Sequence, residues 1–267
     1  MKLFDAHNHL QDERLIPHLE QITSELPKLG LVESVVAGSG AEDWPEVEAL
    51  ANHYSWVRPS FGVHPWYVSE QPGNWQQILV QFLEASPNAM VGEIGLDRWI
   101  KDADVPLQLR FFKTQLQMAA DLKRTPTVHC LQAWGLLLET IKSAPRQARG
   151  FLLHSYGGPS EMVSEFVKLG AHFSVSPYFL HARKAAQLNT FLQVIPIERL
   201  HLETDAPDMW PPPERCPYPL LDPAGRPIND PRNITWFYDE FAKLKNLNAE
   251  DLAAILEQNH RQLFGGA

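Results

Sequence analysis

The feature that most constrains this chain is the alternation of short apolar runs with longer amphipathic stretches. Eight such runs are predicted to be strands, and several are rich in Val, Ile and Phe. They cover residues 2–7, 31–37, 57–63, 89–94, 125–129, 150–154, 171–175 and 199–204. The stretches between them carry apolar residues at helical spacing, as in residues 107–122, where Leu109, Phe112 and Leu116 recur. The chain therefore alternates strand and helix.

Such alternation predicts a parallel sheet, because parallel neighbours need a crossover that is usually a helix. Eight strand–helix units in 267 residues fit a (β/α)8 TIM barrel, a fold that typically takes about 250 residues. An open doubly wound sheet is the structural alternative, but no G-x-G-x-x-G follows the first strand. We predict a single α/β domain over residues 1–267, ending in two helices at residues 234–244 and 249–263.

One segment interrupts the alternation. Residues 206–233 hold nine of the 22 prolines and show no helical or strand pattern. Loops of this length are usually functional or disordered. The apolar side chains of Met209, Trp210, Tyr218, Leu220 and Leu221 favour order. We predict an ordered Pro-rich loop over the active-site mouth.

The bulk composition excludes several classes of protein. A net charge of -9 opposes broad attraction to nucleic acid, although bound divalent cations could still create a local phosphate site. Cys130 and Cys216 are the only cysteines, so no disulfide framework is expected. No run of about 18 apolar residues predicts a membrane span, and no secretory signal begins the chain. These features predict a soluble cytoplasmic protein with no obligate protein partner.

Six residues with side chains suited to metal binding lie at the carboxyl ends of predicted strands. They are His7, His9, Glu93, His129, His154 and Asp205. Period-two alternation places the first two on one face of their strand, and barrel active sites are built at the carboxyl ends of strands. Each residue alone is more often an ordinary buried polar group. Six at the same end of one barrel indicate a site.

Four imidazoles and two carboxylates suit Zn, Mn, Mg, Ni or Fe, and could hold one or two divalent ions bridged by a carboxylate. Asp205 would be both a ligand and the proton acceptor for a metal-activated water, whose pKa falls to about 7 on zinc. The pattern therefore predicts a metal-dependent hydrolase.

The chain resembles the TatD family of the amidohydrolase superfamily along nearly its whole length. The matching motifs are Asp5-Ala6-His7-Asn8-His9, Gly62-Val63-His64-Pro65, Val91-Gly92-Glu93-Ile94-Gly95-Leu96-Asp97, His129-Cys130, Leu153-His154-Ser155-Tyr156-Gly157-Gly158, Leu202-Glu203-Thr204-Asp205-Ala206-Pro207, Pro231-Arg232-Asn233 and Gln258-Asn259-His260-Arg261-Gln262-Leu263-Phe264-Gly265. The resemblance implies a distorted TIM barrel, a mono- or dinuclear metal site, and hydrolysis of phosphodiesters, typically in DNA. It implies the six residues as ligands with Glu93 bridging, so that Asp205 and Glu93 are the expected catalytic residues. It also implies that His64 binds substrate or phosphate.

The chain departs from the family pattern where phosphate would bind. The family usually has Arg two positions after the strand-5 histidine and an acidic residue next, whereas this chain has Leu131 and Gln132. An Arg could pair bidentately with a phosphate, and Leu131 cannot. The family also commonly has His-Pro-His where this chain has His64-Pro65-Trp66. The metal chemistry survives these changes, but they weaken the prediction of a DNA substrate.

Four tryptophans follow shortly after predicted strand ends: Trp66, Trp99, Trp134 and Trp210. They could pack the loops, or they could form a stacking surface for a nucleobase or another flat group. We predict that Trp66 and Trp99 bind substrate together with His64. Arg98 and Lys101 could replace the missing cation, or could be solvated surface charges.

Three functions remain open from the sequence. The first is a deoxyribonuclease of the 3'-5' exonuclease type acting on DNA ends, and the second is a small-molecule amidohydrolase, esterase or lactonase with the same chemistry. The third is a non-catalytic metal-binding scaffold. The complete ligand set argues against the third, whereas Leu131 and the net charge weaken the first relative to the second.

Overall fold

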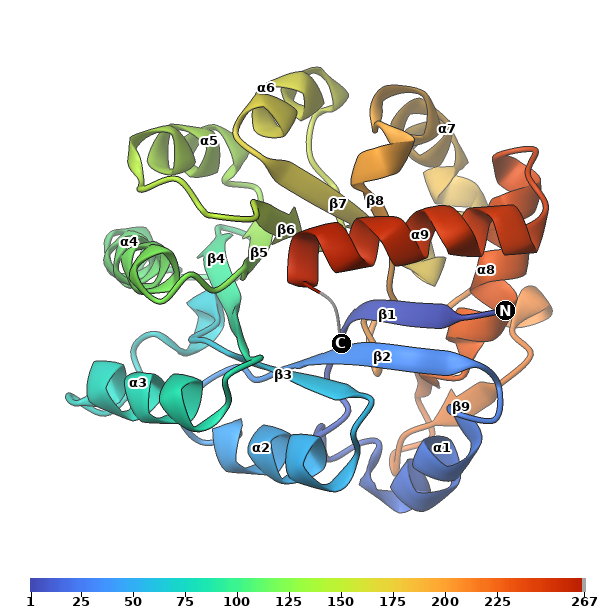
Figure 1. Ribbon diagram of the computed structural model, residues 1–267, viewed down its shortest axis with the longest axis horizontal. Coiled ribbons are helices and arrows are strands. Elements are labelled where there is room, and N and C mark those ends of the chain that lie inside the picture. Colours follow the sequence, from blue (N-terminus) through green and yellow to red (C-terminus); the bar gives the residue numbers. More distant parts are fainter. Residues whose placement is uncertain (266–267) are drawn as a thin grey trace.

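The computed structural model describes residues 1–265 and contains eight parallel strands arranged in sequence order around a nearly closed barrel (Figure 1). The strands are β1 (Leu3–Asn8), β2 (Leu31–Ala37), β3 (Val57–Phe61), β4 (Met90–Asp97), β5 (Pro126–Leu131), β6 (Phe151–Leu153), β7 (Ala171–Val175) and β8 (Leu200–Leu202). Each pairs in parallel with the next along the chain. The predicted TIM barrel is confirmed.

Helices surround the strands on the outside of the barrel (Figure 1). They are α1 (Leu19–Glu25), α2 (Trp44–His53), α3 (Trp75–Ala85), α4 (Val105–Asp121), α5 (Trp134–Ser143), α6 (Val163–Lys168), α7 (Ala185–Val194), α8 (Asn233–Leu244) and α9 (Ala249–Phe264). The long helix α4 buries an apolar stripe against the barrel that includes Phe112 and Leu116.

The barrel closes between β8 and β1 through individual bonds. The backbone N–H of Asp205 donates to the carbonyl of His7 at 2.9 Å. The carboxylate of Asp5 accepts from the backbone N–H of Thr204 at 2.9 Å and from its hydroxyl at 2.6 Å. This junction brings the residues that follow β8 beside the end of β1.

The two ends of the barrel differ. At the amino ends of the strands, α9 crosses the barrel (Figure 1), and its Leu263 and Phe264 join a buried apolar cluster. The other members of that cluster are Ala6, Val35, Met90 and Leu152. The carboxyl ends of the strands lie at the other end, which is called the mouth below.

Some element boundaries differ from the prediction. β4 runs on to Asp97, so that Glu93 lies within the strand rather than at its end, beside a register shift between Val91 and Ile94. β5 also continues past His129 to Leu131. Both strands lengthen because β4 and β5 pair with each other beyond the apolar runs.

Residues 206–233, predicted as an ordered Pro-rich loop without a helix or strand pattern, do contain short regular elements. They contain a short 3-10 helix, Pro213–Arg215, and an antiparallel hairpin of β9 (Pro219–Leu221) and β10 (Pro227–Asn229). A proline begins each strand, a position that β-structure tolerates. Asp222 forms the turn by accepting backbone N–H bonds from Ala224 and Arg226.

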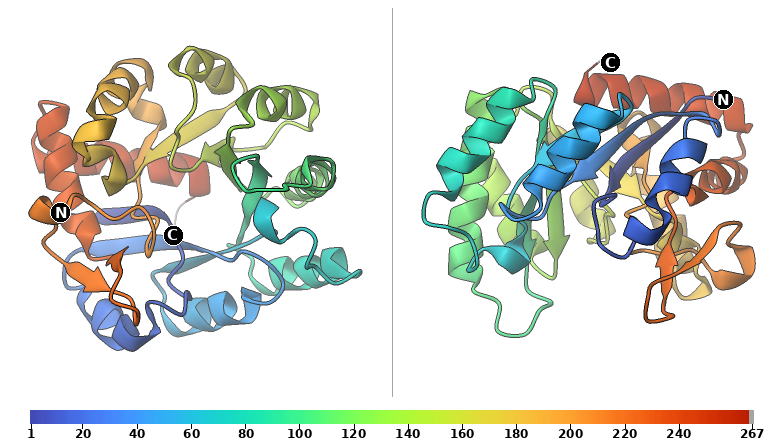
Figure 2. Two further views of the ribbon diagram at one scale, coloured as in Figure 1. Left: turned by 180° about the vertical axis from the view of Figure 1, so that it is seen from behind. Right: turned by 90° about the horizontal axis from the view of Figure 1, so that it is seen from below.

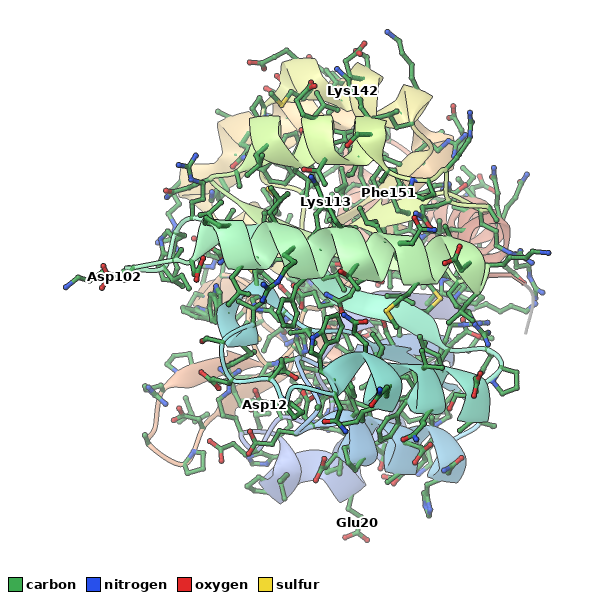
Figure 3. All side chains as sticks on the ribbon, turned by 90° about the vertical axis from the view of Figure 1, so that its left-hand side faces the viewer. Asp12, Glu20, Asp102, Lys113, Lys142 and Phe151 are labelled. Carbon is green, nitrogen blue, oxygen red and sulfur yellow. The ribbon has the colours of Figure 1, made fainter. Side chains whose placement is uncertain are left out.

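Two projections extend beyond the strand ends on opposite sides of the mouth (Figure 2, right). One is this hairpin, and the other is the loop after β4, which carries Asp102 outward (Figure 3).

Within residues 1–265, no helix combines the length and apolar character that crossing a membrane requires.

Candidate active site

The carboxylate of Glu93 lies at the centre of the mouth and is almost fully buried. Its Oε2 lies 3.2 Å from Nε2 of His7 and 3.3 Å from Nε2 of His9. Its Oε1 faces three other imidazole nitrogens: those of His154 at 2.7 Å, His129 at 2.9 Å and His64 at 3.5 Å. The two oxygens of one side chain thus serve two separate groups of histidines.

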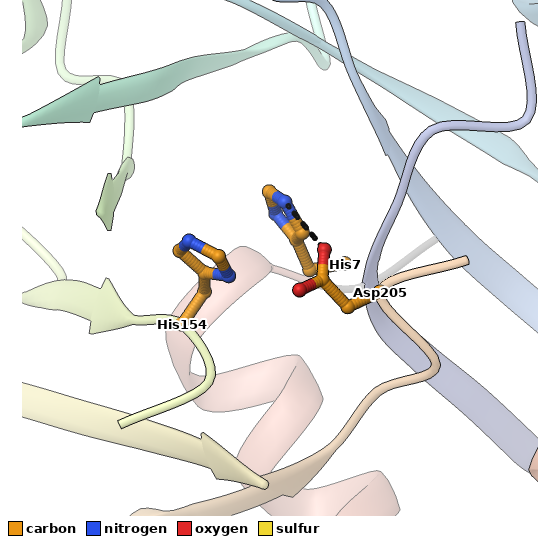
Figure 4. A group of neighbouring side chains, drawn as sticks. All are labelled: His7, His154 and Asp205. Carbon is orange, nitrogen blue, oxygen red and sulfur yellow. Dashed lines mark ion pairs between the residues drawn. The ribbon is translucent and has the colours of Figure 1, made fainter. Parts of the chain in front are cut away.

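Asp205 approaches the first of these groups from the end of β8. Its Oδ1 lies 3.7 Å from Nε2 of both His7 and His9. Figure 4 shows its carboxylate together with the imidazoles of His7 and His154. Asp205 has φ +53°, a left-handed conformation that is uncommon outside glycine but that Asp adopts more readily than most residues.

Three groups of side chains in the described part of the chain could hold a metal ion. They are His7 with His154 and Asp205, His7 with His9 and Glu93, and His64 with Glu93 and His129. Within each group the candidate ligand atoms lie within 4.8 Å of one another. The structure therefore brings together all six residues predicted as ligands. It places His64, predicted to bind substrate, among them.

Neighbouring groups orient two of these imidazoles. Nδ1 of His9 bonds to the carbonyl of Ala37 at 2.8 Å, and Nε2 of His129 donates to Asp97 Oδ2 at 2.9 Å. In each ring the other nitrogen then faces Glu93, which is how outer partners orient metal-binding histidines. Asp97 was not among the site residues predicted from the sequence. Its position four residues after Glu93, on the same face of β4, was the available signal.

Glu203 lies beside His154, where its carboxylate Oε1 is 3.8 Å from Nδ1 of the imidazole. This separation exceeds a hydrogen bond, although the carboxylate is fully buried and accepts the hydroxyl of Ser174. His201, on the same strand, lies deeper in the barrel, with its ring 5.6 Å from that of Phe264. Among the ion pairs of residues 1–265, neither residue is paired with Glu93.

The electrostatics of the site favour a bound cation. Burial alone would raise the pKa of Glu93, but the imidazoles of His154, His64 and His7 lower it well below its ordinary value. Burial raises the pKa of Asp205, and the neighbouring Glu203 adds to the effect. Buried carboxylates are costly unless opposite charge reaches them. A divalent cation held between these groups would supply that charge.

Two of the four tryptophans near the mouth form an exposed pair. The rings of Trp66 and Trp99 are stacked, with centroids 6.2 Å apart and an interplanar angle of 24°. Trp66 is 39% exposed and Trp99 is 62% exposed. Trp134 instead packs against the ring of Tyr156, so the interpretation as loop packing holds for it.

Other residues singled out in the sequence take ordinary places. Arg98 and Lys101 are exposed, and their side chains form no hydrogen bond or ion pair with any described residue. Cys130 packs in the core, and burial raises the pKa of its thiol to about 12. Both features disfavour the thiolate form that a cysteine nucleophile requires.

The TatD related DNase family matches residues 4–265. The chain belongs to this family. The predicted family is thereby confirmed, and with it the prediction of a hydrolase. Divalent-metal binding, which the three side-chain groups allow, is also consistent with membership of the TatD family.

Curated relatives and solved structures agree with the family match. A protein of Citrobacter koseri named 3'-5' ssDNA/RNA exonuclease TatD is 25% identical over 98% of this chain and 99% of its own length. A protein of the same name from a Pantoea strain is 27% identical over the same shares. The TatD homolog YJJV from Escherichia coli k12 has a TM-score of 0.88 at 25% identity, covering 99% of this chain and 98% of its own.

Proposed function

We propose that the protein is a divalent-metal-dependent 3'-5' exonuclease that acts on single-stranded DNA or RNA. The named activity of the Citrobacter koseri and Pantoea relatives supports the substrate class. The observation that carries the proposal is the placement of Glu93, whose two oxygens face two separate groups of histidines. A carboxylate in that position can bridge two ions, as two-metal phosphodiesterases require.

The donor set fits such a centre. His7, His9 and Asp205 would hold one ion, His129 and His154 would hold the other, and Glu93 would bridge them. Imidazole and carboxylate ligands suit Zn, Mn or Fe, with Mg and Ni as further candidates. When bound, the ions would polarise the scissile phosphate and lower the pKa of water.

Asp205 would accept the proton of the attacking water. Its carboxylate is buried at the end of β8 beside the histidines, within reach of a water held between them. Its Oδ1, 3.7 Å from His7 and His9, faces the side of Glu93 that these two histidines occupy. The proton would thus be taken up beside His7 and His9.

His64 would bind a phosphate oxygen. Its Nδ1 accepts the backbone N–H of Trp66 at 3.2 Å, so the neutral ring carries its proton on Nε2. Burial lowers the pKa of His64 to about 4, which keeps the ring neutral near pH 7. An N–H rather than a lone pair therefore faces the site, an arrangement that suits a phosphate oxygen better than a metal ion.

The exposed indoles of Trp66 and Trp99 would stack on the terminal base. Such contacts contribute roughly 1–3 kcal/mol per base and tolerate any sequence. Residues 206–233, which contain this hairpin and the exposed Trp210, would form one wall of the active-site mouth.

A second function is favoured by one observation. Leu131 ends β5 as a half-buried apolar side chain close to His129, where a phosphate-binding cation would be useful. A small ester or lactone would not need that cation. The alternative is therefore a small-molecule hydrolase with the same metal chemistry.

The decisive experiment combines a substrate panel with one substitution. Metal-loaded protein would be assayed on single-stranded DNA, RNA, simple esters and lactones. Asp205→Asn should lower turnover by at least about a hundredfold, because the proton acceptor is lost. Asp239→Asn, on the exposed face of α8, is the matched control and should leave turnover unchanged.

Near-normal turnover by metal-loaded Asp205→Asn would remove the proposed role of this residue. Hydrolysis of esters or lactones with DNA and RNA left intact would replace the exonuclease with the alternative.

A further inference from the structure

Asp97 is completely buried, yet it contacts three different parts of the mouth. Its Oδ2 accepts the indole N–H of Trp66 at 2.7 Å and the Nε2–H of His129 at 2.9 Å. Its Oδ1 accepts the backbone N–H of Trp99 at 2.6 Å. The three donors come from the segment after β3, from β5 and from the loop after β4.

In both hydrogen bonds to Oδ2, Asp97 is the acceptor and its partner is the donor. An indole N–H can only donate, and the carboxylate can only accept. A carboxylate oxygen has two lone pairs, and here Trp66 and His129 occupy both. A rotation of Asp97 that strengthened one of these bonds would therefore weaken the other.

The backbone N–H of Asp97 is also fixed, because it donates to Oε1 of the buried Gln108 on α4 at 2.9 Å. This bond fixes the main chain of Asp97, from which the carboxylate extends to Trp66, Trp99 and His129. Oδ2 orients His129, one of the predicted metal ligands, and holds the indole of Trp66.

We propose that Asp97 is a positioning residue that couples the aromatic surface of Trp66 and Trp99 to His129. Through the shared oxygen, it holds the ring on which a terminal base stacks and the ring that binds the second ion in one geometry. This inference rests on the proposed exonuclease function for its substrate. Its metal-binding part does not depend on that function.

The test separates the indole N–H from the indole ring. Trp66→Phe keeps an aromatic surface and removes only the N–H, whereas Trp66→Ala removes both. Asp97→Asn removes the charge and one acceptor. Trp134→Phe is the matched control, because Trp134 also follows a strand but packs against Tyr156 away from Asp97.

Two quantities would be measured on each folded variant. The first is the dissociation constant for Mn²⁺ or Zn²⁺, with the metal retained after dialysis counted by mass spectrometry. The second is kcat and KM on a single-stranded oligonucleotide with a normal 3'-terminal nucleotide, compared with one whose terminal nucleotide is abasic.

Coupling predicts that Asp97→Asn weakens metal binding by about 10- to 100-fold, the usual effect of losing an outer partner of a ligand histidine. Trp66→Phe should weaken it by roughly two- to tenfold, the effect of one hydrogen bond, and should lower kcat on both oligonucleotides. Trp66→Ala should additionally raise KM, but only for the oligonucleotide with a terminal base. Trp134→Phe should match the wild type.

Wild-type metal affinity and kcat in Trp66→Phe would overturn the coupling, even if Asp97→Asn failed to fold. A wild-type protein that cleaves neither DNA nor RNA would instead overturn the proposed function, while the metal measurements would still decide whether Trp66 and His129 are coupled.

Discussion

Both ends of this barrel bury histidines, but the two groups are built differently. At the mouth, five imidazoles face the single carboxylate of Glu93. At the opposite end, His172 contacts His201 at 2.9 Å, and His260 contacts Glu33 at 2.5 Å. Each end thus offers several imidazole nitrogens in a buried setting.

The two ends differ in whether arginine contacts the buried carboxylate and imidazoles. Arg58 forms two bonds to the carboxylate of Glu33, at 2.7 and 2.9 Å, and Arg199 donates to His172 at 2.9 Å. No arginine or lysine approaches Glu93 among the ion pairs of residues 1–265. A divalent cation would be repelled at the end that holds Arg58 and Arg199 and attracted at the mouth. A buried carboxylate without an arginine or lysine partner, rather than the number of histidines, distinguishes the proposed metal site.

Neutralising the carboxylates of Glu93 and Glu33 in turn tests this difference between the two ends most directly. Glu93→Gln should abolish retention of at least one ion and lower turnover by over about a thousandfold, because both histidine groups lose their shared partner. Glu33→Gln should leave metal content unchanged but lower the free energy of unfolding by about 3–5 kcal/mol, because Arg58 becomes a buried unpaired charge. Metal analysis, kinetics and denaturant unfolding would measure these effects.

The reverse pattern, with metal lost in Glu33→Gln and kept in Glu93→Gln, would show that the ends were assigned wrongly. Equal stability of Glu33→Gln and the wild type would show that Arg58 finds another partner or water.

Acid should lower the free energy of unfolding through the buried imidazole of His172. Burial, together with Arg199, lowers the pKa of His172 to about 3. Between pH 6.5 and 3 the unfolded chain therefore binds a proton that folded His172 does not. Stability should fall as pH falls through this range, by about 1.4 kcal/mol per pH unit from this residue, with no contribution above about pH 7.

The measurement is the free energy of unfolding at pH 6.5 and at pH 5. Buried histidines at the mouth also titrate, so the informative quantity is a difference between proteins. His172→Gln should reduce the slope by about one proton, whereas the exposed His53→Gln should reproduce the wild-type slope. An unchanged slope in His172→Gln would mean that folded His172 is protonated beside Arg199.

Much of this architecture could be read from the sequence, for physical reasons. Strands buried on both faces produce continuous apolar runs, and all carboxyl ends of parallel strands meet at one end of a barrel. Strand-end residues such as His129 and Asp205 were therefore predicted to meet, even though they lie far apart in the chain. The roles of the individual ligands remain predictions.

Features that depend on contacts between loops were not predictable. The link through Asp97 needs the indole of Trp66 to reach across from the segment after β3. Exposure separates Trp99 from Trp134, although both follow a strand in the same way. The β9–β10 hairpin was not predicted because proline, which lacks an N–H group, normally argues against a strand. The two strands nevertheless pair as an antiparallel ladder.

The last prediction has the smallest effect and concerns charge at the mouth. Under the exonuclease proposal, Leu131→Arg would place a guanidinium near His129, where it could pair with a phosphate. The KM for single-stranded DNA should fall several-fold, roughly the value of one charge-assisted bond near solvent, and the gain should fade as salt rises. Hydrolysis of a neutral ester or lactone should not improve.

Leu244→Arg provides the matched control. It changes the net charge equally, but it lies at the end of α8, where a cation suits the helix terminus. If both substitutions lower the KM equally, the gain is a general effect of a less negative protein, and residue 131 has no special place. If Leu131→Arg alone lowers it, the end of β5 faces the phosphate. If Leu131→Arg instead weakens DNA cleavage, the guanidinium repels the ions at His129 and His154, and the mouth then behaves like the arginine-lined end of the barrel.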